Sequence, residues 1–182
     1  MKKSPIIIVS VSALILILFL IYQNFFIPEQ PTNEMKIKSV FQPSTRIPDK
    51  YTCNGENINP SLEISEIPNN TKTLAIIVDD PDAPSKVWVH WLIWNLPAKI
   101  PLTKIKESEL AGIEGINDFK EIGYIGPCPP KDSGDHRYFF KVYALNSQIE
   151  LKQGATKEQL EKAMNGHIVD KTELIGLYSR ES

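Results

Sequence analysis

Ten consecutive residues, 87–96, constrain the fold of this chain more than any other stretch. They read Val-Trp-Val-His-Trp-Leu-Ile-Trp-Asn-Leu, and β-branched and aromatic residues of this kind are typical of strands. Side chains of a strand alternate between its two faces, so Val89 and Trp91 are expected on one face and His90 on the other. Both faces are largely apolar. The stretch is therefore predicted to be a central strand of a sheet that is covered on both sides.

Further segments of similar composition predict a mainly β protein. They are residues 36–41, 73–79 and 138–145, with a closing strand at 174–178. The chain has 14 prolines and 9 glycines, and their clusters between these segments predict long ordered loops. One helix is expected near the C-terminus, because Thr156 and Gln159 have the spacing of a capping box. Leu160 and Met164 then follow on one helical face.

The N-terminal region is distinct from the rest of the chain. Residues 5–22 read PIIIVSVSALILILFLIY without a charge, and a helix of this length spans the core of a bilayer. We predict a membrane anchor at 1–27, a proline-containing linker at 28–35 and one domain at 36–182. Two lysines precede the apolar run, so the positive-inside rule places the domain on the extracytoplasmic side of the cell membrane. The alternative is a cleaved signal peptide, whose apolar region is usually shorter.

The charge of the chain excludes one class of partner. Twenty basic and 22 acidic side chains leave a formal charge of -2, and the predicted domain contains no block of basic residues. A nucleic-acid-binding protein needs such a basic surface, so no nucleic-acid partner is predicted.

Two cysteines occur in the chain, Cys53 and Cys128, and both stand in turn-like sequence. An extracytoplasmic location permits them to form a disulfide, which makes them a candidate pair. The alternative is two unrelated free thiols.

Acidic, imidazole and aromatic side chains gather in two segments that lie far apart in the sequence. Asp80 and Asp82 form the turn Asp-Pro-Asp-Ala-Pro and precede His90, which stands between two tryptophans. His136 and Tyr138 belong to the second segment, Gly-Asp-His-Arg-Tyr. Because buried polar groups need partners, the two segments are predicted to meet in one polar pocket set into an apolar sheet.

Three kinds of chemistry suit this set of residues. Imidazole and carboxylate ligands bind zinc or iron, but the spacing here matches no metal signature, so no metal or other cofactor is predicted. Acid-base catalysis needs a nucleophile, and Ser85 and Ser133 lack the sequence of a nucleophile elbow while Cys128 lies between prolines. Histidine side chains, backbone N–H groups and a tyrosine hydroxyl can all donate to a phosphate, which favours an anion site.

Each residue also has an ordinary structural role when it is taken alone. The Asp-Pro-Asp sequence is typical of a turn that an aspartate side chain closes. His90 is compatible with a core histidine bonded to a backbone carbonyl, and Arg137 with a simple ion pair. The joint occurrence of these residues is what favours a binding site.

The ordered motifs of the chain resemble the phosphatidylethanolamine-binding protein (PEBP) family, in particular its bacterial and archaeal Raf kinase inhibitor-like branch. The likeness covers roughly residues 36–180. Its pieces are YTCNGENINPSL from Tyr51, the DPDAP turn, Val89-His-Trp with Asn95-Leu-Pro, Asn117-Asp-Phe, GYIGPCPP from Gly123, Gly134-Asp-His-Arg-Tyr and Tyr143-Ala-Leu.

The resemblance implies a PEBP-like β fold with a central antiparallel sheet, a smaller second sheet and peripheral helices. It also implies a cavity that binds phosphate-type anions or phospholipid head groups. By position the cavity residues would be Asp80, His90, Pro129, Pro130, His136 and Tyr138, with Trp88 at the mouth. Family members often have glycine in the place of Cys128, and this departure fits a disulfide to Cys53.

The function implied is that of a membrane-tethered, non-enzymatic binding protein with an inhibitory or regulatory role. One alternative is an extracytoplasmic serine-protease inhibitor that acts through a surface loop, with the protease as its partner. A second alternative is a small hydrolase.

Overall fold

The structure is a computed structural model that describes residues 15, 16, 18, 19, 34–109 and 111–181. The chain divides into two units, residues 1–33 and 34–182, and each is described by itself. In the first unit Ile15, Leu16, Leu18 and Phe19 are helical and exposed. The predicted anchor and linker lie mostly outside the described residues. Among the residues that are described, no helix has the length and apolar character needed to cross a membrane.

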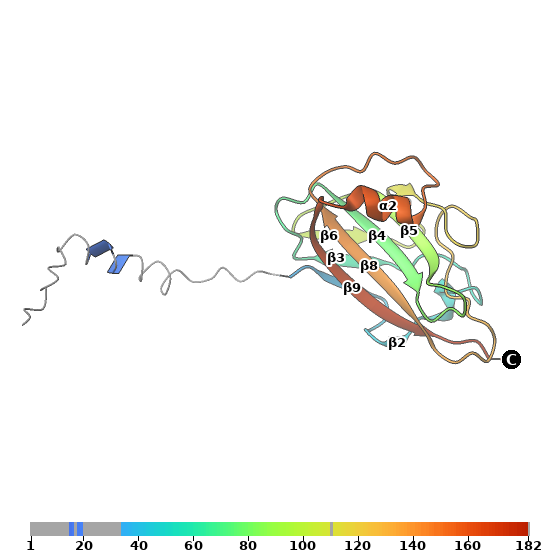
Figure 1. Cartoon of the computed structure of the whole chain (residues 1–182). Coiled ribbons are helices and arrows are strands. Elements are labelled where there is room, and N and C mark those ends of the chain that lie inside the picture. The colour runs from blue at the N-terminus through green and yellow to red at the C-terminus, as the bar shows by residue number, and fades with distance from the viewer. Residues whose placement is uncertain (1–14, 17, 20–33, 110, 182) are drawn as a thin grey trace, which may run out of the picture. The chain divides into compact units, whose positions relative to one another are not determined.

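The second unit is built on two β-sheets (Figure 1). The large sheet has the strand order β2 (Thr45–Arg46), β9 (Ile168–Tyr178), β8 (His136–Leu145), β4 (Thr73–Asp80), β5 (Trp88–Pro97) and β7 (Ile113–Glu114). The small sheet has the order β1 (Lys36–Ser39), β3 (Leu62–Ser65) and β6 (Leu102–Ile105). Helix α2 (Lys157–Met164) and the 3-10 turn η1 (Asp49–Tyr51) accompany them. Neighbouring strands are antiparallel, except that β2 runs parallel to β9.

Different layers cover the two faces of the large sheet. One face packs on the small sheet, so that Ile76 and Phe140 of the large sheet share a core with Leu62 and Ile64 of β3. The opposite face packs under α2 through a second core that includes Ala75, Ile77, Leu92, Leu160 and Met164. The prediction of a mainly β fold with two sheets is confirmed. Within the described part of the second unit, a single α-helix stands where the plural peripheral helices were expected.

The predicted strands at 36–41, 73–79, 87–96 and 138–145 correspond to β1, β4, β5 and β8 with somewhat different ends. The closing strand is longer than predicted, because β9 begins at Ile168 instead of 174. Its first half is polar, and its backbone pairs with β8 regardless of that. Strands β2, β3, β6 and β7 were missed, since segments of two to four residues carry little periodic signal.

Strand β5 is covered on both faces as predicted, but its place and its alternation differ from the prediction. It lies beside the two-residue strand β7, while β4 and β8 occupy the middle of the sheet. The register passes from Val78 opposite Trp91 to Asp79 opposite Val89, so His90 is the extra residue of a β-bulge. Val89 therefore packs in the α2 core and Trp91 in the other core. Strict alternation was wrong at this point, because a bulge shifts every side chain that precedes it to the opposite face.

Helix α2 begins as the sequence predicted. The Thr156 side chain accepts a hydrogen bond from the backbone N–H of Gln159, and the Gln159 side chain accepts one from the N–H of Thr156. This reciprocal pair satisfies donors that a helix start otherwise leaves free. Leu160 and Met164 are buried against the sheet, so the helix start and its first residue, Lys157, are held in place.

Candidate functional site

The candidate site lies where three neighbouring strands meet at one end of the large sheet. Asp80 is the last residue of β4, His136 is the first residue of β8, and His90 lies near the start of β5. Because these strands are antiparallel, the end of β4 stands between the beginnings of the other two. Tyr138 follows on the same face of β8 as His136. We refer to Asp80, His90, His136 and Tyr138 as the histidine cluster.

Asp80 has two tasks in this cluster. Its Oδ1 accepts a hydrogen bond of 2.8 Å from the backbone N–H of Asp82, which closes the Asp-Pro-Asp turn. Its Oδ2 lies 2.8 Å from Nδ1 of His136, and both side chains are buried. Since a carboxylate only accepts hydrogen bonds, Nδ1 of His136 carries the proton in this contact. Closing the turn and orienting an imidazole are thus done by the same side chain.

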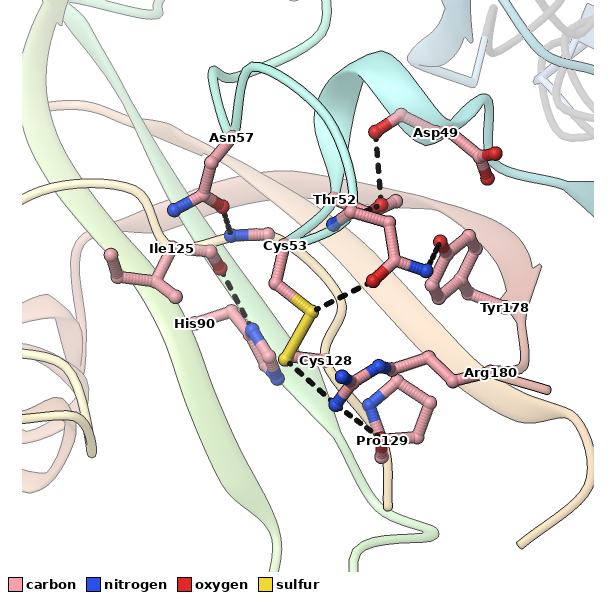
Figure 2. The surroundings of a disulfide bond; sticks show 12 residues. Asp49, Thr52, Cys53, Asn57, His90, Ile125, Cys128, Pro129, Tyr178 and Arg180 are labelled. Atoms are coloured by element: carbon pink, nitrogen blue, oxygen red, sulfur yellow. Dashed lines mark hydrogen bonds between the residues drawn. A yellow bond between two sulfur atoms is a disulfide. The ribbon is translucent and has the colours of Figure 1, made fainter. Parts of the chain in front are cut away.

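His90 is a buried ring whose charge state is set by its surroundings. Its Nδ1 lies 2.8 Å from the carbonyl oxygen of Ile125 and donates to it (Figure 2). The ring contacts Tyr138 and Phe119 edge to face, at centroid distances of 5.2 and 5.4 Å. Burial lowers the pKa of His90 below its ordinary value, against the opposing effects of the Ile125 carbonyl and the charge of Asp80. The ring is therefore neutral with Nδ1 protonated, and Nε2 remains as an acceptor.

Two buried donors at the site have no partner among the described residues. The hydroxyl of Tyr138 and the indole N–H of Trp88 make no hydrogen bond of normal geometry to any described group. Burial, followed by the charge of Asp80, raises the pKa of Tyr138 far above its usual range, so the hydroxyl keeps its proton. Unpaired buried donors are costly, and a ligand with acceptor oxygens would remove that cost.

Asp82 and Arg137 form an ion pair at the rim of the histidine cluster. The guanidinium donates from Nε and Nη2 to the two carboxylate oxygens of Asp82 at 2.9 and 2.7 Å. The backbone N–H of Arg137 donates to the same carboxylate at 2.9 Å. These bonds lower the pKa of Asp82 to about 2. Arg137 therefore has the ordinary ion-pair role considered from the sequence. The ion pair holds the Asp-Pro-Asp turn against the start of β8.

The proline-rich loop before β8 covers the cluster from one side. Pro129 is buried, and its carbonyl accepts from Arg180 at 3.3 Å. Pro130 is exposed, and its carbonyl accepts from the Ser133 hydroxyl at 2.8 Å. Ser133 Oγ also lies 3.0 Å from Nε2 of His136. The two prolines thus act through the path of the backbone, which brings Ser133 to the imidazole.

A disulfide joins Cys53 to Cys128 and ties this loop to the segment after η1 (Figure 2). The Cα atoms are 5.4 Å apart and the two residues are 75 positions apart in the sequence. Backbone bonds run beside it, because Cys53 N–H donates to Pro127 at 3.1 Å and Gly126 N–H donates to Asn57 Oδ1 at 2.8 Å. A side chain at Gly126 would collide with the backbone of Tyr51, so the two segments are in close contact.

The histidine cluster is closely packed. All four of its residues are buried. The exposed fraction is 3% for Asp80, 2% for His90, 4% for His136 and 0% for Tyr138. Five hollows of about 380 to 660 Å³ open on the surface of the domain, and none of these five is lined by the cluster. Of the residues around the cluster, Trp88 is half-buried and Ser133 is exposed.

Several residues of the site were not singled out from the sequence for the part they play. Phe119 contacts both His90 and Trp88, and the Ile125 carbonyl fixes the His90 ring. Ser133 was set aside because it lacks a nucleophile elbow, although its spacing of three residues from His136 was visible. Among the described residues, no three His, Cys, Asp or Glu side chains are grouped so that they could hold a metal ion.

Comparison with known proteins identifies the family of the chain. A model of the phosphatidylethanolamine-binding protein family matches residues 37–179. A UPF0098 protein of Pyrococcus horikoshii is 49% identical over 156 residues, covering 81% of this chain and 77% of that protein. A UPF0098 protein of Pyrococcus abyssi is 50% identical over 153 residues, covering 81% of this chain and 86% of that protein. The chain belongs to the phosphatidylethanolamine-binding protein family, as its motifs predicted.

Solved structures agree with this assignment. The crystal structure of a putative phosphatidylethanolamine-binding protein homolog from Chlamydia trachomatis superimposes with a TM-score of 0.76 at 39% identity, covering 82% of this chain and 99% of that one. The structure of YbcL from Escherichia coli, a member of the same family, gives a TM-score of 0.73 at 28% identity, covering 81% and 99%. The mainly β fold with two sheets is therefore the fold of this family.

Proposed function

We propose that this protein is a ligand-binding member of its family that takes up a phosphate-type anion at the histidine cluster, either as a free ion or as a phospholipid head group. The observation that carries the proposal is the pair of unpartnered buried donors, the Tyr138 hydroxyl and the Trp88 indole N–H. Phosphate oxygens are strong acceptors and suit donors of this kind.

The two imidazoles contribute differently to such a site. His90 is neutral, with Nδ1 bonded to Ile125, so its Nε2 accepts from a protonated phosphate oxygen. His136 is held by Asp80 through Nδ1, and its Nε2 faces the exposed side at Ser133. An anion that arrives from that side meets His136 first, and backbone N–H groups of the loop complete its coordination.

The membrane anchor predicted at residues 1–27 would hold the domain close to a bilayer surface. We place the domain outside the cytoplasm, tethered to the cell membrane, where phospholipid head groups lie close to it. A tethered domain that binds head groups or related anions suits a regulatory or inhibitory role. In the alternative role of a protease inhibitor, a surface loop of the domain would bind the protease.

Calorimetry on the full chain tests the anion site with inorganic phosphate and, separately, with glycerophosphoethanolamine. Phosphate affinity is expected to rise between pH 8 and pH 5.5, because an imidazolium binds an anion better than a neutral ring. Burial lowers the pKa of His90, so that ring stays neutral to lower pH. Tighter binding of glycerophosphoethanolamine than of phosphate would identify a head-group site, and equal binding a site for the free anion.

Tyr138→Phe removes only the hydroxyl and is expected to weaken phosphate binding about tenfold, the value of one hydrogen bond to a charged group. Tyr143→Phe is the matched control, because Tyr143 lies on the opposite face of β8 and packs in the α2 core. Equal affinities of the two variants, or an affinity that does not change with pH, would refute the anion site. Protease inhibition that survives His90→Ala with His136→Ala would assign inhibition to a loop and not to the cluster.

A further inference from the structure

Ser133, His136 and Asp80 form a continuous hydrogen-bonded chain. Ser133 Oγ is 3.0 Å from Nε2 of His136, and Nδ1 of the same ring is 2.8 Å from Asp80 Oδ2. This is the connectivity of a serine, histidine and aspartate triad, which is recognised by geometry and not by the order of its members in the sequence. The absence of a nucleophile-elbow sequence therefore does not decide against it.

The positions of the protons in the hydrogen bonds of Ser133, His136 and Asp80 suit a nucleophilic serine. Asp80 holds the proton of His136 on Nδ1, so Nε2 of the neutral ring has a lone pair directed at Ser133. The Pro130 carbonyl lies 2.8 Å from the same hydroxyl and competes for its single proton. That contact fixes the position of the oxygen, and transfer of the proton to Nε2 leaves the oxygen free to attack.

The three hydrogen-bonded residues differ in burial in the way that nucleophilic catalysis requires. Ser133 is exposed to solvent, whereas His136 and Asp80 are exposed by 4% and 3%. A substrate can therefore reach the hydroxyl, while the base and its carboxylate lie in a low-dielectric environment that strengthens their interaction.

The two residues after Ser133 supply donors for a developing negative charge. The backbone N–H groups of Gly134 and Asp135 have no acceptor within the part of the chain that the structure describes. Gly134 has a φ of 82° and open space where a Cβ would stand, so the backbone there is accessible. Successive free N–H groups beside a nucleophile are suited to an oxyanion.

We propose that Ser133 is a nucleophile for small carboxylic esters, with His136 as its general base. Oγ attacks the carbonyl carbon, the hydroxyl proton passes to Nε2, and the carbonyl oxygen becomes an oxyanion beside Gly134 and Asp135. The carbon–oxygen bond to the alcohol then breaks, and the alcohol leaves with the proton from Nε2. Water repeats the sequence on the acyl-serine, so one ester and one water give one acid and one alcohol.

The test treats the full chain with an alkyl fluorophosphonate, which phosphonylates an activated serine with loss of fluoride. Intact mass and peptide mapping are expected to show one adduct, on Ser133. Ser133→Ala is expected to abolish it, and His136→Gln to slow it about 100-fold, the contribution of a general base. Ser85→Ala is the matched control, since Ser85 is also an exposed loop serine, and the labelling of this variant should equal that of the wild type.

Release of p-nitrophenol from p-nitrophenyl acetate provides a second readout, which should be present in the wild type and lost in Ser133→Ala. No adduct, an adduct that persists in Ser133→Ala, or no ester turnover would overturn the proposal. If His136→Gln does not fold, the wild type and Ser133→Ala decide the question. Phosphate binding without an adduct leaves the anion site intact and refutes the nucleophile, whereas an adduct without phosphate binding does the reverse.

Discussion

Asp79 and Asp80 are adjacent buried aspartates that face opposite sides of the large sheet, and their partners differ. Asp79 has no exposed surface and lies under α2, with Nζ of Lys141 at 2.8 Å and Nζ of Lys157 at 2.6 Å. Asp80 faces the other side, where its partners are one imidazole and one backbone N–H. The residue type and the burial are the same, but within the described part of the chain Asp80, and not Asp79, lies beside the Tyr138 hydroxyl, a donor without a partner there.

The difference shows that burial of a carboxylate does not by itself mark a functional site. The Asp79 carboxylate contacts two ammonium groups, that of Lys141 from β8 and that of Lys157 from α2. These ion pairs neutralise its charge and tie the helix to the sheet. The Tyr138 hydroxyl beside Asp80 has no partner of normal hydrogen-bond geometry among the described residues. We therefore expect changes on the Asp79 side to alter stability and changes on the Asp80 side to alter ligand binding.

The largest effect is expected from the disulfide, which lies on the Asp80 side but has a structural role. Replacing Cys53 and Cys128 by serine should lower the free energy of unfolding by about 4 kcal/mol, because the bond closes a long loop in the unfolded chain. Phosphate affinity should stay unchanged, since hydrogen bonds at Pro127 and Gly126 still hold the two segments together. Urea unfolding and calorimetry measure the two quantities. Lost binding in a folded variant would show that the bond positions the site.

Asp79→Asn and Asp80→Asn form a direct test of the comparison between the two faces. Asp79→Asn should lower the free energy of unfolding by about 3 kcal/mol, because it leaves two ammonium groups without their carboxylate. The value lies at the low end of the range for buried pairs, since Lys141 and Lys157 are partly exposed and can reach water. Phosphate affinity should be unaffected.

Asp80→Asn should have the opposite profile, with a small change in stability and a loss of phosphate affinity of about tenfold or more. The amide oxygen can keep the hydrogen bond from the backbone N–H of Asp82, which limits the loss of stability, but the amide NH2 group cannot accept from Nδ1 of His136 and no longer orients that ring. Urea unfolding and calorimetry with phosphate are performed on both variants. The comparison fails if both substitutions change the same quantity.

The smallest effect is a dependence of stability on pH that arises from His90. Burial lowers the pKa of His90 in the folded protein, so below about pH 6.5 the unfolded chain binds a proton that the folded chain refuses. The free energy of unfolding should therefore fall as the pH falls from about 6.5 toward the lowered value, by at most about 1.4 kcal/mol per pH unit. Chemical denaturation between pH 8 and 5 measures the slope, and His90→Gln should flatten it. A slope that persists in this variant would assign it to another group.

Much of the fold followed from local patterns. Alternating and apolar runs located β1, β4, β5 and β8, and the capping box located α2, because these signals come from residues close together in the sequence. The bulge at His90 had no such signal. Whether two residues of one strand stand opposite one residue of the next depends on the partner strand, so the faces of Val89 and Trp91 were assigned wrongly.

The candidate site was predicted as a set of residue types and motifs but not as a set of contacts. Aspartate, imidazole and tyrosine in two segments indicated a polar pocket, and the order of the motifs indicated the family. The Ser133 contact to His136 could not be read in the same way, because it depends on how the proline-rich loop turns back over β8.

The sequence by itself determined strands β1, β4, β5 and β8, the start of helix α2, the family of the protein and the residue types available for a site. Only the tertiary structure decided that Asp79 meets two lysines while Asp80 meets an imidazole, and that His90 stays neutral. The physical reason is that local conformation depends on neighbours along the chain, whereas charge, burial and hydrogen-bond partners depend on residues that the fold brings together from distant positions.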